Sequence, residues 1–226
     1  MKLLDALPPA WRKAVSCACG LVAFTLVFTA LMAFTYEMTR ERIDAAKDEQ
    51  QMRLIDEVLP RERYDNTLLA DAVSAPGNTA NVGRIWRARR GADAVALVFE
   101  AFADDGYGGR IELIVGIGDD GRVTGVRVGA HHETPGLGDY IEPAKDRRHQ
   151  NKPWIAQFEG VDANLPKARW TVKKDGGDFD YRAGATVSPR AVTVAVGRGV
   201  LWVNKHRAAL FEAPTDAKLN DEARTE

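Results

Sequence analysis

Hydrophobic positions form one uninterrupted apolar run near the N-terminus of the chain. The run covers residues 14–36 and contains no charged side chain. At about 1.5 Å per residue, a helix of this length is roughly 35 Å long and exceeds a hydrocarbon core of about 30 Å. A cleaved signal peptide has a shorter apolar core and a small-residue cleavage site, which residues 34–37 do not offer. The pattern predicts a transmembrane helix over 14–36.

Helix-forming residues with a thin apolar stripe continue as far as Leu59, and Pro60 then ends the pattern. We therefore expect a helical stalk over 37–60 that prolongs the membrane helix. Lys and Arg residues are almost equal in number on the two sides of the span, so the positive-inside rule gives little indication of its orientation. A short basic tail before a first span most often stays in the cytoplasm. We expect a cytoplasmic tail over 1–13 and the main domain outside.

Four strand-like runs follow a polar, turn-rich segment at 61–83. Three of them alternate between apolar and polar positions and one is densely apolar; they cover 84–90, 94–102, 110–116 and 122–128. Short Gly-rich connections between them predict an antiparallel sheet. The G-x-G-x-x-G sequence at 116–121 leads into another alternating strand. A dinucleotide fingerprint must open a helix, so we interpret these glycines as a hairpin turn.

Helical spacing returns near the C-terminus, where Val192, Val196 and Val200 mark one buried face. Ser188 is expected at the N-cap of this helix and Pro189 at its first position. A small-residue turn against a helix N-terminus suits a phosphate, although an ordinary capped helix explains the same pattern. The chain as a whole predicts an α+β fold, an antiparallel sheet with flanking helices, over 61–212. A charged, disordered tail is expected over 213–226.

Composition excludes several classes of protein. Lys+Arg 31 against Asp+Glu 32 gives a net charge of -1, which is not the basic footprint of a nucleic-acid binder. Cys17 and Cys19 both lie in the apolar run, so we expect neither a disulfide framework nor a Cys-based metal site in the soluble part. His131 and His132 precede Glu133, but adjacent side chains diverge and no second ligand pair follows. We interpret them as solvated loop histidines and expect no metal.

Three segments in a fixed order carry a family resemblance: HHETPGLGD at 131–139, a Trp–Phe pair at 154 and 158, and D-x-x-A-G-A-T-V-S at 180–188. With these, the chain resembles the FMN-binding family formed by the G subunit of the Rnf (or Rsx) electron-transport complex. The C subunit of the sodium-pumping NADH:quinone reductase is a relative of that protein. The resemblance covers nearly the whole chain, including the anchor, the stalk that ends in DEVLPRERYDN and the GYGG turn at 106–109.

The resemblance implies FMN bound covalently to Thr186 through a phosphoester bond. The resemblance also implies that a separate flavin transferase attaches it, using FAD and a magnesium ion. The transferase motif Asp-x-x-(Ser/Thr)-Gly-Ala-Thr is matched by Asp180, Gly184, Ala185 and Thr186, whereas Ala183 stands where the family often has a hydroxyl. Tyr107 is expected to flank the flavin ring. The remaining cofactor-binding residues are expected to be Glu133, Thr134, Gly136, Leu137, Gly138, Gly184, Ala185, Val187 and Ser188.

The function that the resemblance implies is an electron relay, with no catalytic residue of its own, within an ion-translocating ferredoxin:NAD oxidoreductase. The chain would sit in the bacterial inner membrane with its main domain in the periplasm. Its expected partners are the other membrane and peripheral subunits, the flavin transferase and the lipid bilayer, with no nucleic acid. Two alternatives stay open: the C subunit of a sodium-translocating NADH:quinone reductase, and a membrane-anchored, non-redox sensor or binding module.

Overall fold

The computed structural model describes residues 8–76, 81–146 and 152–218. The chain divides into two compact units, 1–49 and 50–226. Helix α1, Pro9–Val58, is continuous for 50 residues and ends just before Pro60. The predicted membrane helix and the predicted stalk are therefore one helix. Within the described residues, it is the helix that is long and apolar enough to cross a membrane.

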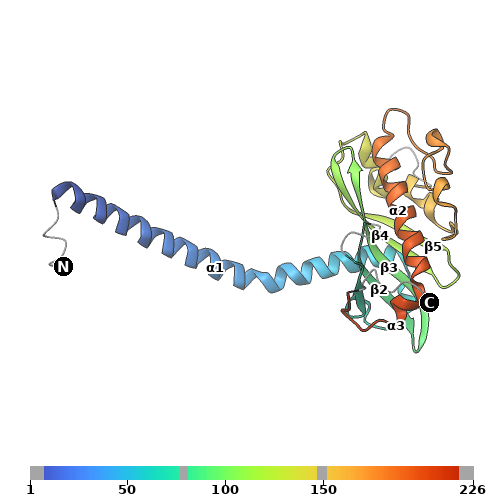
Figure 1. Ribbon diagram of the computed structural model, residues 1–226, viewed down its shortest axis with the longest axis horizontal. Helices are drawn as coiled ribbons and strands as arrows, with labels where there is room; N and C mark the ends of the chain where they lie inside the picture. The colour runs from blue at the N-terminus through green and yellow to red at the C-terminus, as the bar shows by residue number, and fades with distance from the viewer. Residues whose placement is uncertain (1–7, 77–80, 147–151, 219–226) are drawn as a thin grey trace. The chain divides into compact units, whose positions relative to one another are not determined.

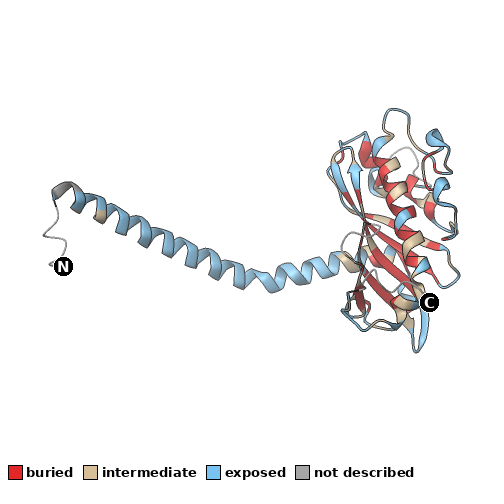
Figure 2. Cartoon of the chain, in the orientation of Figure 1, coloured by how far each residue is buried: buried red, intermediate tan, exposed pale blue. Residues whose placement is uncertain are grey.

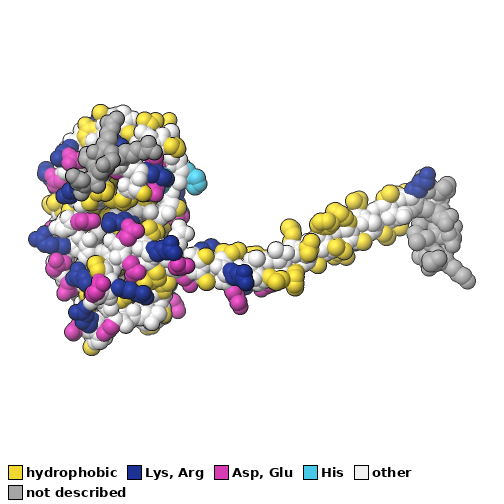
Figure 3. Space-filling view, turned by 180° about the vertical axis from the view of Figure 1, so that it is seen from behind, with side chains coloured by type: hydrophobic (Ala, Val, Ile, Leu, Met, Phe, Trp, Pro, Cys, Tyr) yellow, Lys and Arg dark blue, Asp and Glu magenta, His cyan; other side chains and the backbone are white. Residues whose placement is uncertain are grey.

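Large apolar side chains in the first unit are exposed to solvent. Phe24 is 60% exposed and Met32 70% exposed, and Figure 2 shows α1 in the exposed colour along most of its length. Figure 3 shows hydrophobic side chains along much of the same helix, whereas charges of both signs are spread over the second unit. Exposure of so long a row of apolar side chains to water is energetically unfavourable. This surface fits a lipid environment.

The second unit is built on a five-stranded antiparallel sheet in the order β1-β2-β3-β4-β5 (Figure 1). Its strands are β1 Ala72–Ser74, β2 Val82–Arg90, β3 Asp93–Gly106, β4 Gly109–Gly118 and β5 Val123–Ala130. The four predicted runs are β2 to β5, and residues 116–121 include the hairpin turn between β4 and β5, as predicted. The pattern missed β1, because a strand of three residues inside a polar segment is too short to show alternation.

Both faces of the sheet are buried, which explains the dense apolar run in β3. Leu97 and Phe99 belong to one core, and Ala96 and Val98 to the other, because successive strand residues point to opposite faces. Helix α2, Val187–Lys205, lies along the first face and contacts β3 and β4 (Figure 1), and the short helix α3, Arg207–Glu212, follows it. The α+β fold with flanking helices is thus confirmed.

The second face of the sheet is covered by the end of α1. Ile55, Val58 and Leu59 are at most 1% exposed and share a core with Trp86 and Ile114. The compact unit accordingly begins at residue 50, inside the segment that the sequence assigned to the stalk. Leu68 completes this core from the 3-10 helix Leu68–Ala70, which lies in the segment before β1.

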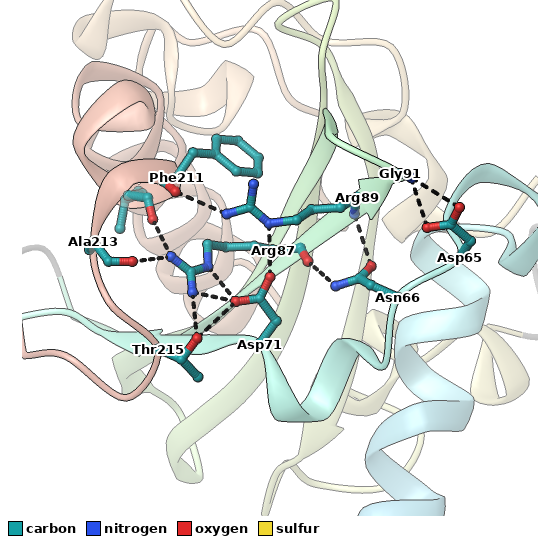
Figure 4. A network of polar contacts seen from close by, with 10 residues as sticks. Asp65, Asn66, Asp71, Arg87, Arg89, Gly91, Phe211, Ala213 and Thr215 are labelled. Atoms are coloured by element: carbon teal, nitrogen blue, oxygen red, sulfur yellow. Dashed lines mark hydrogen bonds and ion pairs between the residues drawn. The ribbon is translucent and has the colours of Figure 1, made fainter.

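The C-terminal segment is held on β2 by a buried arginine (Figure 4). The side chain of Arg87 is 3% exposed, pairs with Asp71, and donates hydrogen bonds to the Ala213 carbonyl and to the Thr215 hydroxyl. Beyond it, the amide of Ser74 donates to the Ala217 carbonyl at 3.0 Å. Residues 213–218 are therefore ordered, and the expectation of disorder is wrong there, because backbone pairing with β1 compensates for their polar composition. Residues 219–226 lie outside the described part.

A region of 3-10 helices between β5 and α2 carries most of the candidate site. The helices are Gly138–Ile141, Pro143–Lys145, Trp154–Phe158, Lys167–Arg169 and Lys173–Asp175. Aromatic rings in contact hold the region together, from Tyr140 through Trp154 and Phe158 to Phe179 and Trp170. The Trp–Phe helix is present, and its rings pack in the core as expected.

Candidate functional site

Most of the predicted site residues line one pocket in the second unit. Its volume is about 170 Å³, and it lies between the β3–β4 turn, the loop after β5 and the start of α2. The lining residues are Tyr107, Glu133, Thr134, Leu137, Gly138, Gly184, Ala185, Thr186, Val187 and Ser188. Segments up to 81 residues apart in the sequence thus meet at a single place.

The rim of this pocket is apolar and open to solvent. Tyr107 is 73% exposed, Leu137 54% and Val187 43%. In the described part of the second unit, these three are the large hydrophobic side chains that are exposed. A soluble surface rarely gathers its exposed apolar residues around one cavity unless something binds there.

Glu133 joins the three segments of the pocket from the inside. The residue is 6% exposed, and its Oε1 accepts a hydrogen bond from the Gly108 amide at 3.0 Å. Its Oε2 accepts a hydrogen bond from the hydroxyl of Ser188, in the first turn of α2. A buried carboxylate is stable only when such donors surround it. Both oxygens of Glu133 are therefore engaged with the protein itself.

Gly138 leaves the space that this carboxylate needs. A Cβ atom at Gly138 would lie 2.3 Å from Oε2 of Glu133 and 3.1 Å from Oγ of Ser188. No side chain fits there without displacing the hydrogen bond that closes the pocket. Close packing against Glu133 and Ser188 thus explains why the second glycine of the Gly-x-Gly sequence cannot carry a side chain.

The start of α2 differs from the expected capping pattern. The helix begins at Val187, so Thr186 is the N-cap residue, Ser188 lies inside the first turn and Pro189 is the third helical residue. The N-cap assignment to Ser188 is wrong because the Ser188 hydroxyl is used by Glu133 instead. Thr186 makes no side-chain capping bond, and its hydroxyl donates to the Arg182 carbonyl at 3.3 Å.

A tight turn presents Thr186 to the pocket. The Ala185 amide donates to the Arg182 carbonyl at 3.1 Å, and Gly184, the third residue of the turn, has φ +84. That conformation is typical of a type II turn and favours glycine. Ala183, the second residue of the turn, is exposed.

Sequence reasoning missed a buried support beneath this turn. Tyr140 is fully buried; its hydroxyl accepts from the Arg182 amide at 3.0 Å and donates to the Ala185 carbonyl at 3.2 Å. The guanidinium of Arg182 lies 4.0 Å from the centre of the Tyr140 ring and pairs with the buried Asp146. Burial raises the pKa of Tyr140 above its ordinary value, while the hydrogen bond from Arg182 opposes the shift. The sequence carried no signal for this support, because one aromatic residue in a loop has no periodicity.

Two of the predicted motif residues do not line the pocket. The amide of Gly136 donates to Asp139 Oδ1 at 2.8 Å, so this glycine shapes the loop from outside. The carboxylate of Asp180 is exposed and lies 2.6 Å from Lys173 Nζ, while its carbonyl accepts from Trp154 Nε1 at 2.6 Å. Asp180 therefore does not contact the Thr186 hydroxyl.

The two loop histidines differ in their surroundings. His132 is exposed, as expected. The side chain of His131 is only 8% exposed, with Nε2 3.2 Å from Glu142 Oε2 and Nδ1 accepting from the Glu133 amide at 3.1 Å. The expectation of a solvated His131 is wrong, because its ring closes the start of the loop that carries Glu133.

A larger cavity of about 550 Å³ lies elsewhere, beside Met52 and residues 61–69. None of the predicted site residues lines it. Its lining lacks the exposed apolar rim and the helix N-terminus that the smaller pocket combines. Size alone does not identify a binding site, so we assign the site to the smaller pocket.

Comparisons with known proteins show which family the chain belongs to. A family model described as the FMN-binding domain matches residues 106–200, and a model of the RnfG N-terminal region matches residues 10–58. The G subunit of the ion-translocating oxidoreductase complex of Escherichia coli (strain K12) is 43% identical over 197 residues, which are 86% of this chain and 93% of that protein. The chain belongs to this G-subunit family.

Other members of the family show the same degree of similarity. The G subunit from Salmonella typhimurium is 44% identical over 193 residues, which cover 84% of this chain and 91% of the relative. That of Vibrio cholerae serotype O1 is 41% identical over 199 residues, which cover 86% and 92%. The resemblance drawn from the sequence motifs is thus confirmed, and these relatives represent the oxidoreductase complex rather than the quinone reductase. The FMN-binding domain match includes every residue that lines the pocket.

Proposed function

We propose that this chain is a single-pass membrane flavoprotein that relays electrons within an ion-translocating oxidoreductase complex. We further propose that its FMN is joined to Thr186 by a phosphoester bond. One observation carries the second proposal. The Thr186 hydroxyl lies at the N-terminus of α2, on a pocket with an apolar rim, and caps nothing. An ordinary threonine N-cap would bond to an amide of its own helix.

The residues of the pocket fit an FMN molecule at both of its ends. The exposed side chains of Tyr107, Leu137 and Val187 offer apolar surface to a flat aromatic ring. The N-terminus of α2 offers free amides and a positive dipole end to the phosphate, a contribution of about 0.3–1 kcal/mol. FMN would supply the redox chemistry, and the protein holds and orients it.

Attachment of FMN needs a second protein, because the chain offers Thr186 no base. Its hydroxyl donates to a backbone carbonyl, and the Asp180 carboxylate is paired with Lys173. An alkyl hydroxyl is a weak nucleophile at neutral pH without a base or metal. We therefore assign activation to a flavin transferase with a magnesium ion. Thr186 Oγ1 attacks the phosphorus of the FMN half of FAD, an O–P bond forms, the pyrophosphate P–O bond breaks, AMP leaves, and the transferase accepts the hydroxyl proton.

The chain is not proposed to be an enzyme in isolation. Its role is to hold the flavin for other membrane and peripheral subunits, which exchange electrons with it. We propose that the short N-terminal tail is cytoplasmic and that the second unit lies in the periplasm. Covalent attachment would then prevent loss of the cofactor outside the cytoplasm.

In-gel fluorescence tests this proposal. The full chain is produced with its flavin transferase, denatured in detergent and inspected under ultraviolet light. Wild-type protein should give a fluorescent band that Thr186→Val abolishes. Thr67→Val is the matched control, because Thr67 is an exposed threonine in the segment before β1 and lies outside this pocket, and it should stay fluorescent. A non-redox sensor or binding module predicts a dark wild-type band, which would overturn the proposal.

A further inference from the structure

We infer that Tyr140 is a positioning residue for flavin attachment at Thr186. The inference rests on the proposed attachment and goes one step further. The Tyr140 hydroxyl holds the turn Arg182–Ala185, here called the acceptor turn, in the shape that the transferase has to recognise.

The hydroxyl of Tyr140 closes the acceptor turn from below. It accepts from the amide of Arg182, the first residue of the turn, and donates to the carbonyl of Ala185, its last residue. The carbonyl of Arg182 accepts hydrogen bonds from the Ala185 amide and from the Thr186 hydroxyl. One buried oxygen atom is therefore hydrogen-bonded to both ends of the turn that precedes Thr186 and fixes the distance between them.

Neighbouring groups keep Tyr140 itself in place. Its ring meets Trp154 edge to face at 5.7 Å, and the Arg182 guanidinium covers it at 4.0 Å. Asp146, whose side chain is fully buried, pairs with Arg182 and accepts from the Trp154 amide at 2.8 Å. The guanidinium can therefore swing away only by breaking its ion pair with a buried carboxylate.

Tyr140 also couples the two loops of the pocket. It belongs to the 3-10 helix Gly138–Ile141, whose first residue lines the pocket beside Glu133 and Ser188. The phenolic hydroxyl reaches from this helix to the acceptor turn. The loop after β5 and the turn before α2 consequently keep a fixed geometry relative to each other.

Removal of one hydroxyl tests the inference. The full chain in detergent is flavinylated with FAD and its transferase, and the rate of covalent flavin incorporation is measured against FAD concentration. Tyr140→Phe should lower kcat on the order of tenfold, because a nucleophile displaced by a fraction of an ångström loses much of its reactivity, and should leave the KM for FAD unchanged. Tyr181→Phe is the matched control and should stay within about twofold of wild type, since the structure gives the Tyr181 hydroxyl no hydrogen bond within the described residues.

The possible outcomes separate this inference from the proposed function. A wild-type chain that takes up no covalent flavin overturns both. A wild-type chain that is flavinylated, with a folded Tyr140→Phe variant that matches its kcat, overturns only the role of Tyr140. If Tyr140→Phe does not unfold cooperatively by tryptophan fluorescence, the double variant Asp146→Asn/Arg182→Gln replaces it. That variant removes both members of the buried ion pair beside the Tyr140 ring, and it should also lower kcat at unchanged KM; a wild-type kcat overturns the inference.

Discussion

The hydroxyl of Ser188 donates a hydrogen bond to the carboxylate of Glu133, although 55 residues separate them in the sequence. The bond ties the first turn of α2 to the loop after β5, and Glu133 in turn holds the β3–β4 turn through the Gly108 amide. Both residues are nearly inaccessible to solvent, at 2% and 6% exposure. The pocket is therefore assembled by a buried polar contact and lined by apolar side chains at its rim.

Glu133→Ala should lower the free energy of unfolding of the full chain by about 2–3 kcal/mol, because the partly buried Gly108 amide and the buried Ser188 hydroxyl lose their acceptor. Chemical denaturation followed by tryptophan fluorescence measures the change. Glu112→Ala, which removes an exposed carboxylate from β4, is the matched control and should change stability by no more than about 0.5 kcal/mol. Equal effects of the two substitutions would contradict the role assigned to Glu133.

Asp71→Ala should destabilise the chain by about 3 kcal/mol, because it leaves the guanidinium of Arg87 buried without its anion. Asp104→Ala provides the comparison, since Asp104 pairs with Arg110 on the surface, where both side chains are at least 44% exposed. Such a pair contributes about 0–1 kcal/mol. The same denaturation experiment measures both variants, and a loss for Asp71→Ala as small as for Asp104→Ala would show that Arg87 does not hold the C-terminal segment.

The stability of the protein should fall at alkaline pH. Burial raises the pKa of Tyr140 above its ordinary value of 10.0, and burial followed by the Asp56 charge raises the pKa of Tyr64. The folded chain thus holds these protons more tightly than the unfolded chain, so their contribution is complete below pH 10 and is lost as pH rises through the folded pKa. Between the two pKa values each tyrosine contributes a slope of about 1.4 kcal/mol per pH unit.

Unfolding measured at several pH values above 10 tests this expectation. Tyr140→Phe should show a shallower decline than wild type, because one of the two tyrosines no longer titrates. An unchanged decline would contradict the assignment of the alkaline effect to Tyr140.

Ala183→Ser should leave the rate of flavin attachment within about twofold of wild type. Ala183 is exposed at the second position of the acceptor turn, and the turn is already closed by the hydrogen bond between Arg182 and Ala185. Exposed substitutions away from packing contacts usually change free energies by less than about 0.5 kcal/mol. Initial rates of flavin incorporation measure the effect. An increase of tenfold or more would mean that the missing hydroxyl contacts the transferase or the phosphate.

Much of the fold follows from periodicity, which is a local property of the chain. The charge-free run at 14–36, the alternation in β2, β4 and β5 and the valine face of α2 are visible before any tertiary contact is known. Features that depend on distant partners were not visible. β1 is ordered through pairing with β2, and residues 213–218 through pairing with β1; a polar composition gives no indication of either partner.

The candidate site shows the same division. The family motifs located Gly138, Gly184 and Thr186, and the structure adds the tight turn at Gly184 and the close approach of Glu133 to Gly138. The roles of Ser188 and Tyr140 depend on side chains that meet only in the folded chain. Capping rules assign a serine before a proline to the N-cap, but the hydrogen bond to Glu133 draws Ser188 into the first turn and leaves Thr186 at the cap. A local rule was thus overridden by a tertiary contact.

The measurement that tests the central proposal most directly is peptide mass spectrometry of the chain produced with its flavin transferase. Trypsin cleaves after Arg182 and Arg190 and releases residues 183–190, which hold two hydroxyl side chains, Thr186 and Ser188. We expect this peptide to gain the mass of one FMN less one water, and fragmentation to place the gain on Thr186. A gain on Ser188, or a peptide recovered without any added mass while the holoprotein retains flavin, would contradict this expectation.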